Sequence, residues 1–142
     1  MELIIHRALY AILVVMAKSD IKKFIDFFYD ASIRIRHEKS VIYRGKDGKL
    51  VKSALIVFSR PQLEMLALWF LAKKPKLAPA VGTMLSKIVL SELQDRIRSA
   101  RFWKDLDSIY ERYYGAIQRQ QTFSKIAEFN KNDVMELQKR LW

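Results

Sequence analysis

The sequence predicts an all-α fold, and three observations lead to this prediction. Apolar residues make up 51% of the 142 residues and aromatic residues 12%, which is too rich for a disordered chain. Only four glycines and three prolines leave little turn chemistry for an all-β protein. Apolar side chains recur at helical spacing along most of the chain. We therefore expect one helical domain, residues 1–142, with about four to five helices in a bundle-like or extended arrangement.

The first expected helix, Glu2–Ala17, is apolar on nearly all sides. Its length of about 16 residues falls short of the roughly 20 that span a bilayer. We expect it to be buried or to face another subunit, with membrane contact through residues 2–17 as the less favoured alternative. Ser19 is the expected N-cap of a second helix. The apolar stripe of that helix consists of Ile21, Phe24, Ile25, Phe28, Ala31 and Ile35.

Positive charge becomes dense after this second helix. Between Arg34 and Lys52, seven cations stand against only Glu38 and Asp47. The glycines of Gly45–Gly48 indicate a turn, so a short hairpin or an ordered loop fits residues 40–58 equally well. Either form gives a basic protrusion that reaches a phosphate backbone, although a loop kept in solution by its lysines fits as well. The seven cations are Arg34, Arg36, Lys39, Arg44, Lys46, Lys49 and Lys52.

A further helix is expected to begin after Ser59. Ser59 and Gln62 match a capping box, Pro61 lies in the first turn, and the helix should end near Lys74. The segment that follows contains two prolines and adds three candidate phosphate contacts. Lysines at a helix C-terminus also stabilise the helix dipole, so a purely structural role remains open. The three candidates are Lys73, Lys74 and Lys76.

The segment Met84–Gln121 is expected to form one long helix with a basic stripe along one side. At about 100° per residue, five cations fall within roughly a 60° sector, over a length on the order of 50 Å. Asp105 interrupts the stripe, and Gly115 bends or ends the helix. An ordinary solvated face with ion pairs is the alternative. The stripe consists of Lys87, Arg98, Arg101, Arg112 and Arg119.

A final helix is expected to begin near Asn132 or Asp133 and to run to Trp142. Trp142 would be unusual on a solvated tail, so we expect it to pack on a neighbour.

Catalysis finds little support in the residue types. The chain has no cysteine, which excludes disulfides, thiolate metal sites and cysteine nucleophiles. It has only two histidines, His6 and His37. Asp26 and Asp30 share a helix face, but nothing joins them to form a metal site. We therefore expect a protein that is not an enzyme and that has no catalytic residue, metal site or cofactor.

The net charge of +11 instead favours a polyanionic partner. No recognition helix with clustered Asn, Gln and Arg is visible, so binding should be independent of base sequence and should depend on Lys and Arg contacts to phosphates. Double-stranded DNA is the expected nucleic acid.

In overall profile the chain resembles the α-helical major coat (nucleocapsid) proteins of filamentous archaeal viruses. The segments that carry this resemblance are Arg34–Lys52, Lys73–Lys76 and the stripe from Lys87 to Arg119. The resemblance implies a virion protein whose helices wrap linear double-stranded DNA in a helical filament. It also implies a homo-oligomer, or a hetero-oligomer with similar subunits.

The alternative is a cytoplasmic accessory subunit that binds nucleic acid without forming a filament. Examples are the small helical subunit of RNA-guided surveillance complexes and a viral inhibitor lodged in the nucleic-acid channel of a polymerase. Assembly distinguishes the two, because a coat protein should bury Glu2–Ala17 and Leu137–Trp142 against neighbouring copies.

Overall fold

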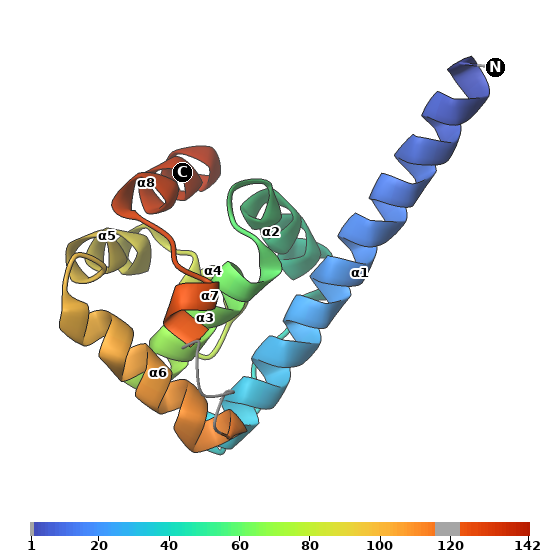
Figure 1. Cartoon of the computed structure of the whole chain (residues 1–142). Helices are drawn as coiled ribbons and strands as arrows, with labels where there is room; N and C mark the ends of the chain where they lie inside the picture. The colour runs from blue at the N-terminus through green and yellow to red at the C-terminus, as the bar shows by residue number, and fades with distance from the viewer. Residues whose placement is uncertain (1, 116–122) are drawn as a thin grey trace.

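The computed structural model describes the backbone of residues 2–115 and 123–142 and the side chains of residues 18–115 and 123–142. Within these ranges the chain forms eight α-helices and no strand (Figure 1). The all-α prediction is confirmed, while about four to five helices was an undercount. The helices are α1 (Glu2–Arg36), α2 (Arg44–Val57), α3 (Arg60–Lys73), α4 (Val81–Met84), α5 (Lys87–Arg96), α6 (Ala100–Tyr114), α7 (Phe123–Ile126) and α8 (Lys131–Leu141).

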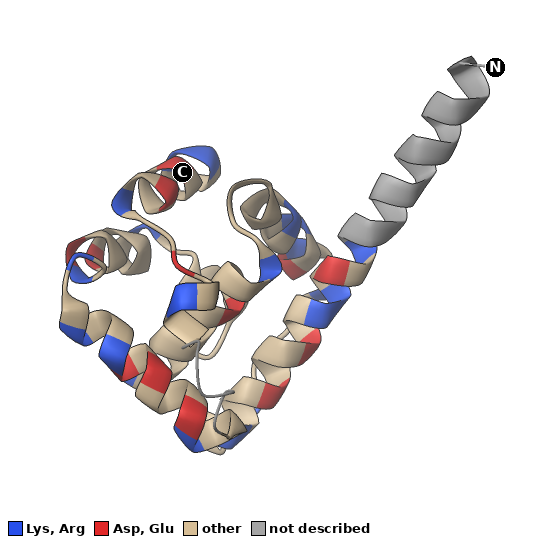
Figure 2. Ribbon diagram, viewed as in Figure 1, with Lys and Arg blue, Asp and Glu red and all other residues tan. Residues whose placement is uncertain are grey.

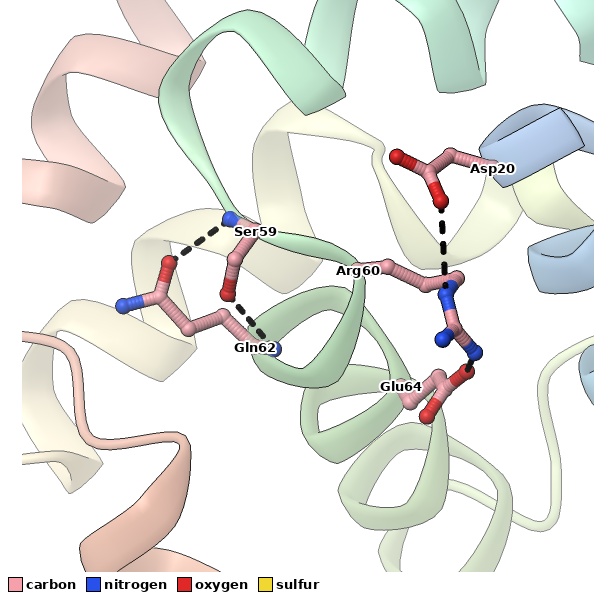
Figure 3. Close-up of polar contacts among 5 residues, drawn as sticks. All are labelled: Asp20, Ser59, Arg60, Gln62 and Glu64. Carbon is pink, nitrogen blue, oxygen red and sulfur yellow. Dashed lines mark hydrogen bonds and ion pairs between the residues drawn. The ribbon is translucent and has the colours of Figure 1, made fainter. Parts of the chain in front are cut away.

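Helix α3 is the centre of the fold. Leu63 and every residue from Met65 to Leu71 are buried, as expected for a helix that is apolar on all sides. Helices α1, α2, α4, α6 and α7 all contact it. The predicted capping box is present: Ser59 Oγ accepts from the Gln62 amide at 3.3 Å, and Gln62 Oε1 accepts from the Ser59 amide at 2.8 Å (Figure 3).

Arg60, the residue after the N-cap Ser59, joins α3 to α1 through an ion pair. The guanidinium of Arg60 lies 3.6 Å from Asp20 and 2.8 Å from Glu64 (Figure 3). Since Asp20 belongs to α1, these contacts place the junction of α2 and α3 beside the middle of α1.

Helix α1 is a single helix, so the prediction of two helices divided at Ser19 is wrong. Its N-terminal end extends beyond the other helices (Figure 1). Toward its C-terminus, Phe24, Phe28 and Ala31 share one face and are buried in the core. The helix ends where His37 takes a left-handed conformation, φ 55°, a common way for a helix to terminate.

Residues 44–57 form helix α2, so the hairpin predicted within residues 40–58 is wrong. Both glycines of Gly45–Gly48 lie inside this helix instead of in a turn. Asp47 explains its start, because Oδ2 accepts from the Tyr43 amide at 2.7 Å and satisfies an N–H that has no partner within the helix. Extended pairing in this region of the described chain is limited to one parallel bridge, between Val41 and Ala80.

The segment Met84–Gln121 is not one helix, which corrects a second prediction. Ser86 Oγ accepts from the Val89 amide at 3.4 Å and starts α5. Ser99 Oγ accepts from the Arg101 amide at 3.2 Å and starts α6. Each serine satisfies a free amide at a new helix start, so residues 97–99 separate two independent helices.

The C-terminal helix α8 starts at Lys131, slightly earlier than predicted, because Asn130 is the N-cap and Asp133 its capping-box partner. The side-chain Nε2 of Gln138 donates to the Lys87 carbonyl at 3.2 Å and so joins α8 to α5. The Trp142 indole donates to the Leu85 carbonyl at 2.7 Å, while 62% of the residue stays exposed. Trp142 is therefore hydrogen-bonded to its own chain while most of its surface stays exposed.

Candidate nucleic-acid interface

Among the described helices, α2 has the largest excess of cations over carboxylates, four against one. Arg44, Lys46, Lys49 and Lys52 are all exposed, and we call them the α2 cationic surface. None of the four forms an ion pair with another described residue. The single carboxylate of the helix, Asp47, is 1% exposed and is occupied by its capping hydrogen bond. Every exposed charge on α2 is therefore positive. Figure 2 shows where lysine and arginine lie along its ribbon.

The spacing of these cations suits a phosphate backbone. From Arg44 to Lys52 the helix rises about 12 Å, at about 1.5 Å per residue. One strand of B-DNA carries roughly three to four phosphates over that length. Lys49 and Lys52 are three residues apart and share one face, while Arg44 and Lys46 flank it from the first turn. The surface can therefore place several cations along one strand.

Three lysines that were not predicted to take part in binding lie on the part of α1 that is joined to the junction of α2 and α3. Lys18, Lys22 and Lys23 are exposed. They lie near the C-terminal end of α2, because the Arg60–Asp20 ion pair joins that end to the same part of α1. In the sequence they look like the ordinary polar face of an amphipathic helix, and only the packing of α1 against α2 relates them to the α2 cationic surface.

The predicted basic stripe does not survive as a continuous surface. Lys87 lies at the start of α5, Arg98 in the break between helices, and Arg101 and Arg112 near opposite ends of α6. Arg119 lies outside the described residues. Helix α5 carries two cations and two carboxylates, and α6 carries three of each, so neither has a net charge. The stripe is an interrupted face with mixed charge.

The fold does bring parts of two predicted basic regions together. Lys73 at the end of α3 lies 3.7 Å from Asp105 of α6. A hollow lies on each side of this ion pair, and together we call them the α3–α6 groove. The hollow of about 340 Å³ is lined by the cations Lys73, Lys74, Arg96 and Arg101, and the hollow of about 490 Å³ by Arg36, Lys73 and Arg112.

Arg96 was not predicted to take part in binding. It lies nine residues after Lys87, which on a continuous helix is the side opposite the stripe. Because the chain breaks at residues 97–99, α5 and α6 have different directions. Arg96 therefore lines the same hollow as Arg101. Only a prediction of that break could have found it.

Arg36 has a structural task. Its Nε donates to the Leu71 carbonyl at 2.8 Å, its Nη1 to Leu77 at 2.6 Å, and its Nη2 to Phe70 and Lys74 at 3.3 and 2.6 Å. These carbonyls lie at and beyond the end of α3, where the last carbonyls of a helix have no partner within the helix. Those of Phe70 and Lys74 also accept from the backbone amides of Lys74 and Leu77. Burial lowers the pKa of Arg36, and nearby Glu38 opposes this shift.

Arg34 is also occupied within the fold. It lies 2.9 Å from Asp30, donates to the Tyr113 carbonyl at 3.1 Å and covers the ring of Tyr114, 5.1 Å from its centroid. Burial, followed by the negative charge of Asp30, raises the pKa of Tyr114. Arg34 therefore joins α1 to the end of α6 and is a weaker candidate for contact with a ligand.

The remaining predicted cations are either exposed or occupied by contacts within the fold. Lys39 and Lys76 are exposed in connecting segments. Lys74 pairs with Glu92, which is also 3.7 Å from Arg96.

The described parts of the chain contain no group of three or more His, Cys, Asp or Glu side chains that could hold a metal ion. No single helix among them is long and apolar enough to cross a membrane; α2 and α3 together reach that length and composition, but they meet at a bend of 118°. Helix α3 is buried inside the protein.

A comparison of the chain with protein-family models, with curated proteins and with solved structures finds no match.

Proposed function

We propose that this chain is a structural DNA-binding protein that holds double-stranded DNA through phosphate contacts from the α2 cationic surface. The observation that supports this proposal is the absence of charge compensation: four exposed cations lie on one helix of 14 residues, and none forms an ion pair with another described residue. Lys46 lies over the ring of Tyr43, 5.9 Å from its centroid, and this contact leaves its charge uncompensated. Unpaired cations gain most from a polyanion, because binding releases the counterions condensed on the DNA.

Binding through this surface should not depend on base sequence. Arginine and lysine contacts to phosphates position a protein on DNA but carry no sequence information. The exposed positions of α2 offer lysine, arginine, glycine and the apolar side chain of Ile56, without the asparagine or glutamine that reads adenine.

The test is a salt titration of duplex binding. Four phosphate contacts predict a slope of about −3.6 in a plot of log affinity against log salt concentration. The double variant Lys49→Gln, Lys52→Gln should lower the magnitude of that slope by about 1.8 and weaken binding equally for unrelated duplex sequences.

A matched control removes the same charge elsewhere. Lys104 and Lys139 are exposed on α6 and α8, and neither is paired with another described residue. The variant Lys104→Gln, Lys139→Gln should change the slope far less than the α2 variant. If the two variants had equal slopes, α2 would contribute to binding only through the net charge of the protein, and the α2 cationic surface would not be the DNA contact.

We propose further that copies assemble along DNA as coat or nucleocapsid subunits. Helix α1 supports this role, because its N-terminal end extends beyond the other helices and is available to a neighbouring copy (Figure 1). Electron microscopy of the protein with linear duplex DNA tests it. Regular filaments are the expected result, whereas discrete complexes of fixed stoichiometry would favour the accessory-subunit alternative.

A further inference from the structure

The α3–α6 groove has an excess of positive charge that its own ion pairs do not remove. Four cations line its smaller hollow, and the only carboxylates there are Glu92 and Asp105. Glu92 is shared by Lys74 and Arg96, and Asp105 is approached by Lys73. No ion pair joins Arg101 to another described residue, and Arg101 is exposed.

The lining of the groove suits a phosphate more than a carboxylate or a neutral ligand. Arg96 and Arg101 each present a planar guanidinium that can donate two parallel hydrogen bonds to one phosphate group. The buried rings of Trp69 and Phe102 form the apolar wall of the hollow and lie 6.1 Å apart between centroids. An apolar wall lowers the local dielectric and strengthens the attraction between these cations and an anion.

The groove and the α2 cationic surface belong to different sides of the central helix. Helix α3 contacts both α2 and α6, and α2 packs mainly against α1 and α8. Figure 1 shows α2 and α6 on separate sides of the body. A duplex segment that lies along α2 is therefore separate from a duplex segment whose phosphates occupy the α3–α6 groove.

We infer that the α3–α6 groove is a second phosphodiester-binding site, and that one copy of the chain can hold two separate duplex segments and bridge them. This inference builds on the proposed binding of DNA through α2. It assigns Arg96 and Arg101 the role of phosphate contacts in the second site, with Lys73 and Lys74 held beside them by Asp105 and Glu92.

The experiment measures bridging and single-duplex binding separately. One duplex is immobilised on beads, a second fluorescent duplex is added with the protein, and the captured fluorescence reports bridging. Affinity for a single short duplex is measured by anisotropy in the same buffer. Three double variants are compared with the unchanged chain: Arg96→Gln with Arg101→Gln, Lys49→Gln with Lys52→Gln, and the control Lys104→Gln with Lys139→Gln.

Bridging needs both sites, so both the groove variant and the α2 variant should lose most of it. For the groove variant, bridging should fall by about tenfold or more, while affinity for a single duplex changes by less than about threefold. The control should bridge like the unchanged chain. Circular dichroism and the thermal midpoint of each variant show whether it is folded, and the single change Arg101→Gln, at an exposed and unpaired side chain, replaces the double variant if that one fails to fold.

Two results would overturn the inference without affecting the proposed function. One is binding of single duplexes by the unchanged chain without bridging. The other is bridging by the groove variant equal to that of the unchanged chain, since bridging would then come from pairs of α2 surfaces on associated copies. If the unchanged chain fails to bind single duplexes at all, the proposed function itself is wrong.

Discussion

The contacts of Arg36 lead to a specific prediction about stability. Its guanidinium donates to four carbonyls, of Phe70, Leu71, Lys74 and Leu77, and lies over the ring of Phe70 at 5.2 Å from the centroid. The substitution Arg36→Met keeps most of the aliphatic stem and removes every donor. It therefore tests the guanidinium as the connection between the end of α1, the end of α3 and the turn that follows.

The expected destabilisation follows from the hydrogen bonds. A hydrogen bond from a charged donor contributes about 1.5–3 kcal/mol, but bonds that share one group are not additive, and water can reach part of this site. We expect Arg36→Met to lower the free energy of unfolding by about 3 kcal/mol. For 142 residues, an unfolding entropy of about 0.3 kcal/mol/K converts this loss into a fall of about 10 °C in the melting temperature.

The assay is equilibrium unfolding in urea, followed by circular dichroism. Arg36→Lys should lose about half as much, because an ammonium group keeps the charge but cannot reach carbonyls as far apart as those of Phe70 and Leu77. Arg98→Met is the matched control: Arg98 is exposed, it forms no ion pair within the described structure, and its change should stay within about 0.5 kcal/mol. If Arg36→Met were as stable as Arg98→Met, the assignment of Arg36 to helix capping would be wrong.

Two further changes test other parts of the fold. Ser59→Ala removes half of the capping box of α3 and should cost about 1 kcal/mol in urea unfolding, whereas Ser59→Gly should cost only a few tenths. If Ser59→Ala were as stable as the unchanged chain, the side-chain oxygen would contribute nothing. Burial raises the pKa of Glu64, with Arg60 opposing the shift, so the folded state holds this proton more tightly than the unfolded state does. The stability gained from this tighter binding is present below the ordinary glutamate pKa of 4.5 and is lost as pH rises through the raised pKa of the folded state. The melting temperature of the unchanged chain should therefore fall relative to Glu64→Gln over that window, and parallel pH curves would contradict the prediction.

Local signals predicted the elements that depend on neighbouring residues. The capping box at Ser59 and the end of α3 near Lys74 are confirmed, because a cap depends on residues three apart and on the proline that follows. Helix α2 was missed for the opposite reason. Two glycines cost roughly 1 kcal/mol each in a helix, and the burial of Val51 and Ala54 against the rest of the fold outweighs that cost.

The candidate site was predictable in composition but not in arrangement. Reading Met84–Gln121 as one helix fixed the relative directions of Lys87, Arg98 and Arg101, and the N-cap at Ser99 changes those directions. The pairing of Lys73 with Asp105 and the convergence of Arg96 and Arg101 depend on how α3, α5 and α6 pack. No periodicity along the chain contains that information.

The unbroken course of α1 has a mechanical consequence. A helix of 35 residues is about 52 Å long and has no hinge between its N-terminal end and the core residues Phe24 and Phe28. If a partner fixes the orientation of the N-terminal end of α1, it therefore also fixes the orientation of the other helices. Copies held by their N-terminal ends would all present α2 at the same angle, whereas a turn at Ser19 would have let each body swivel independently.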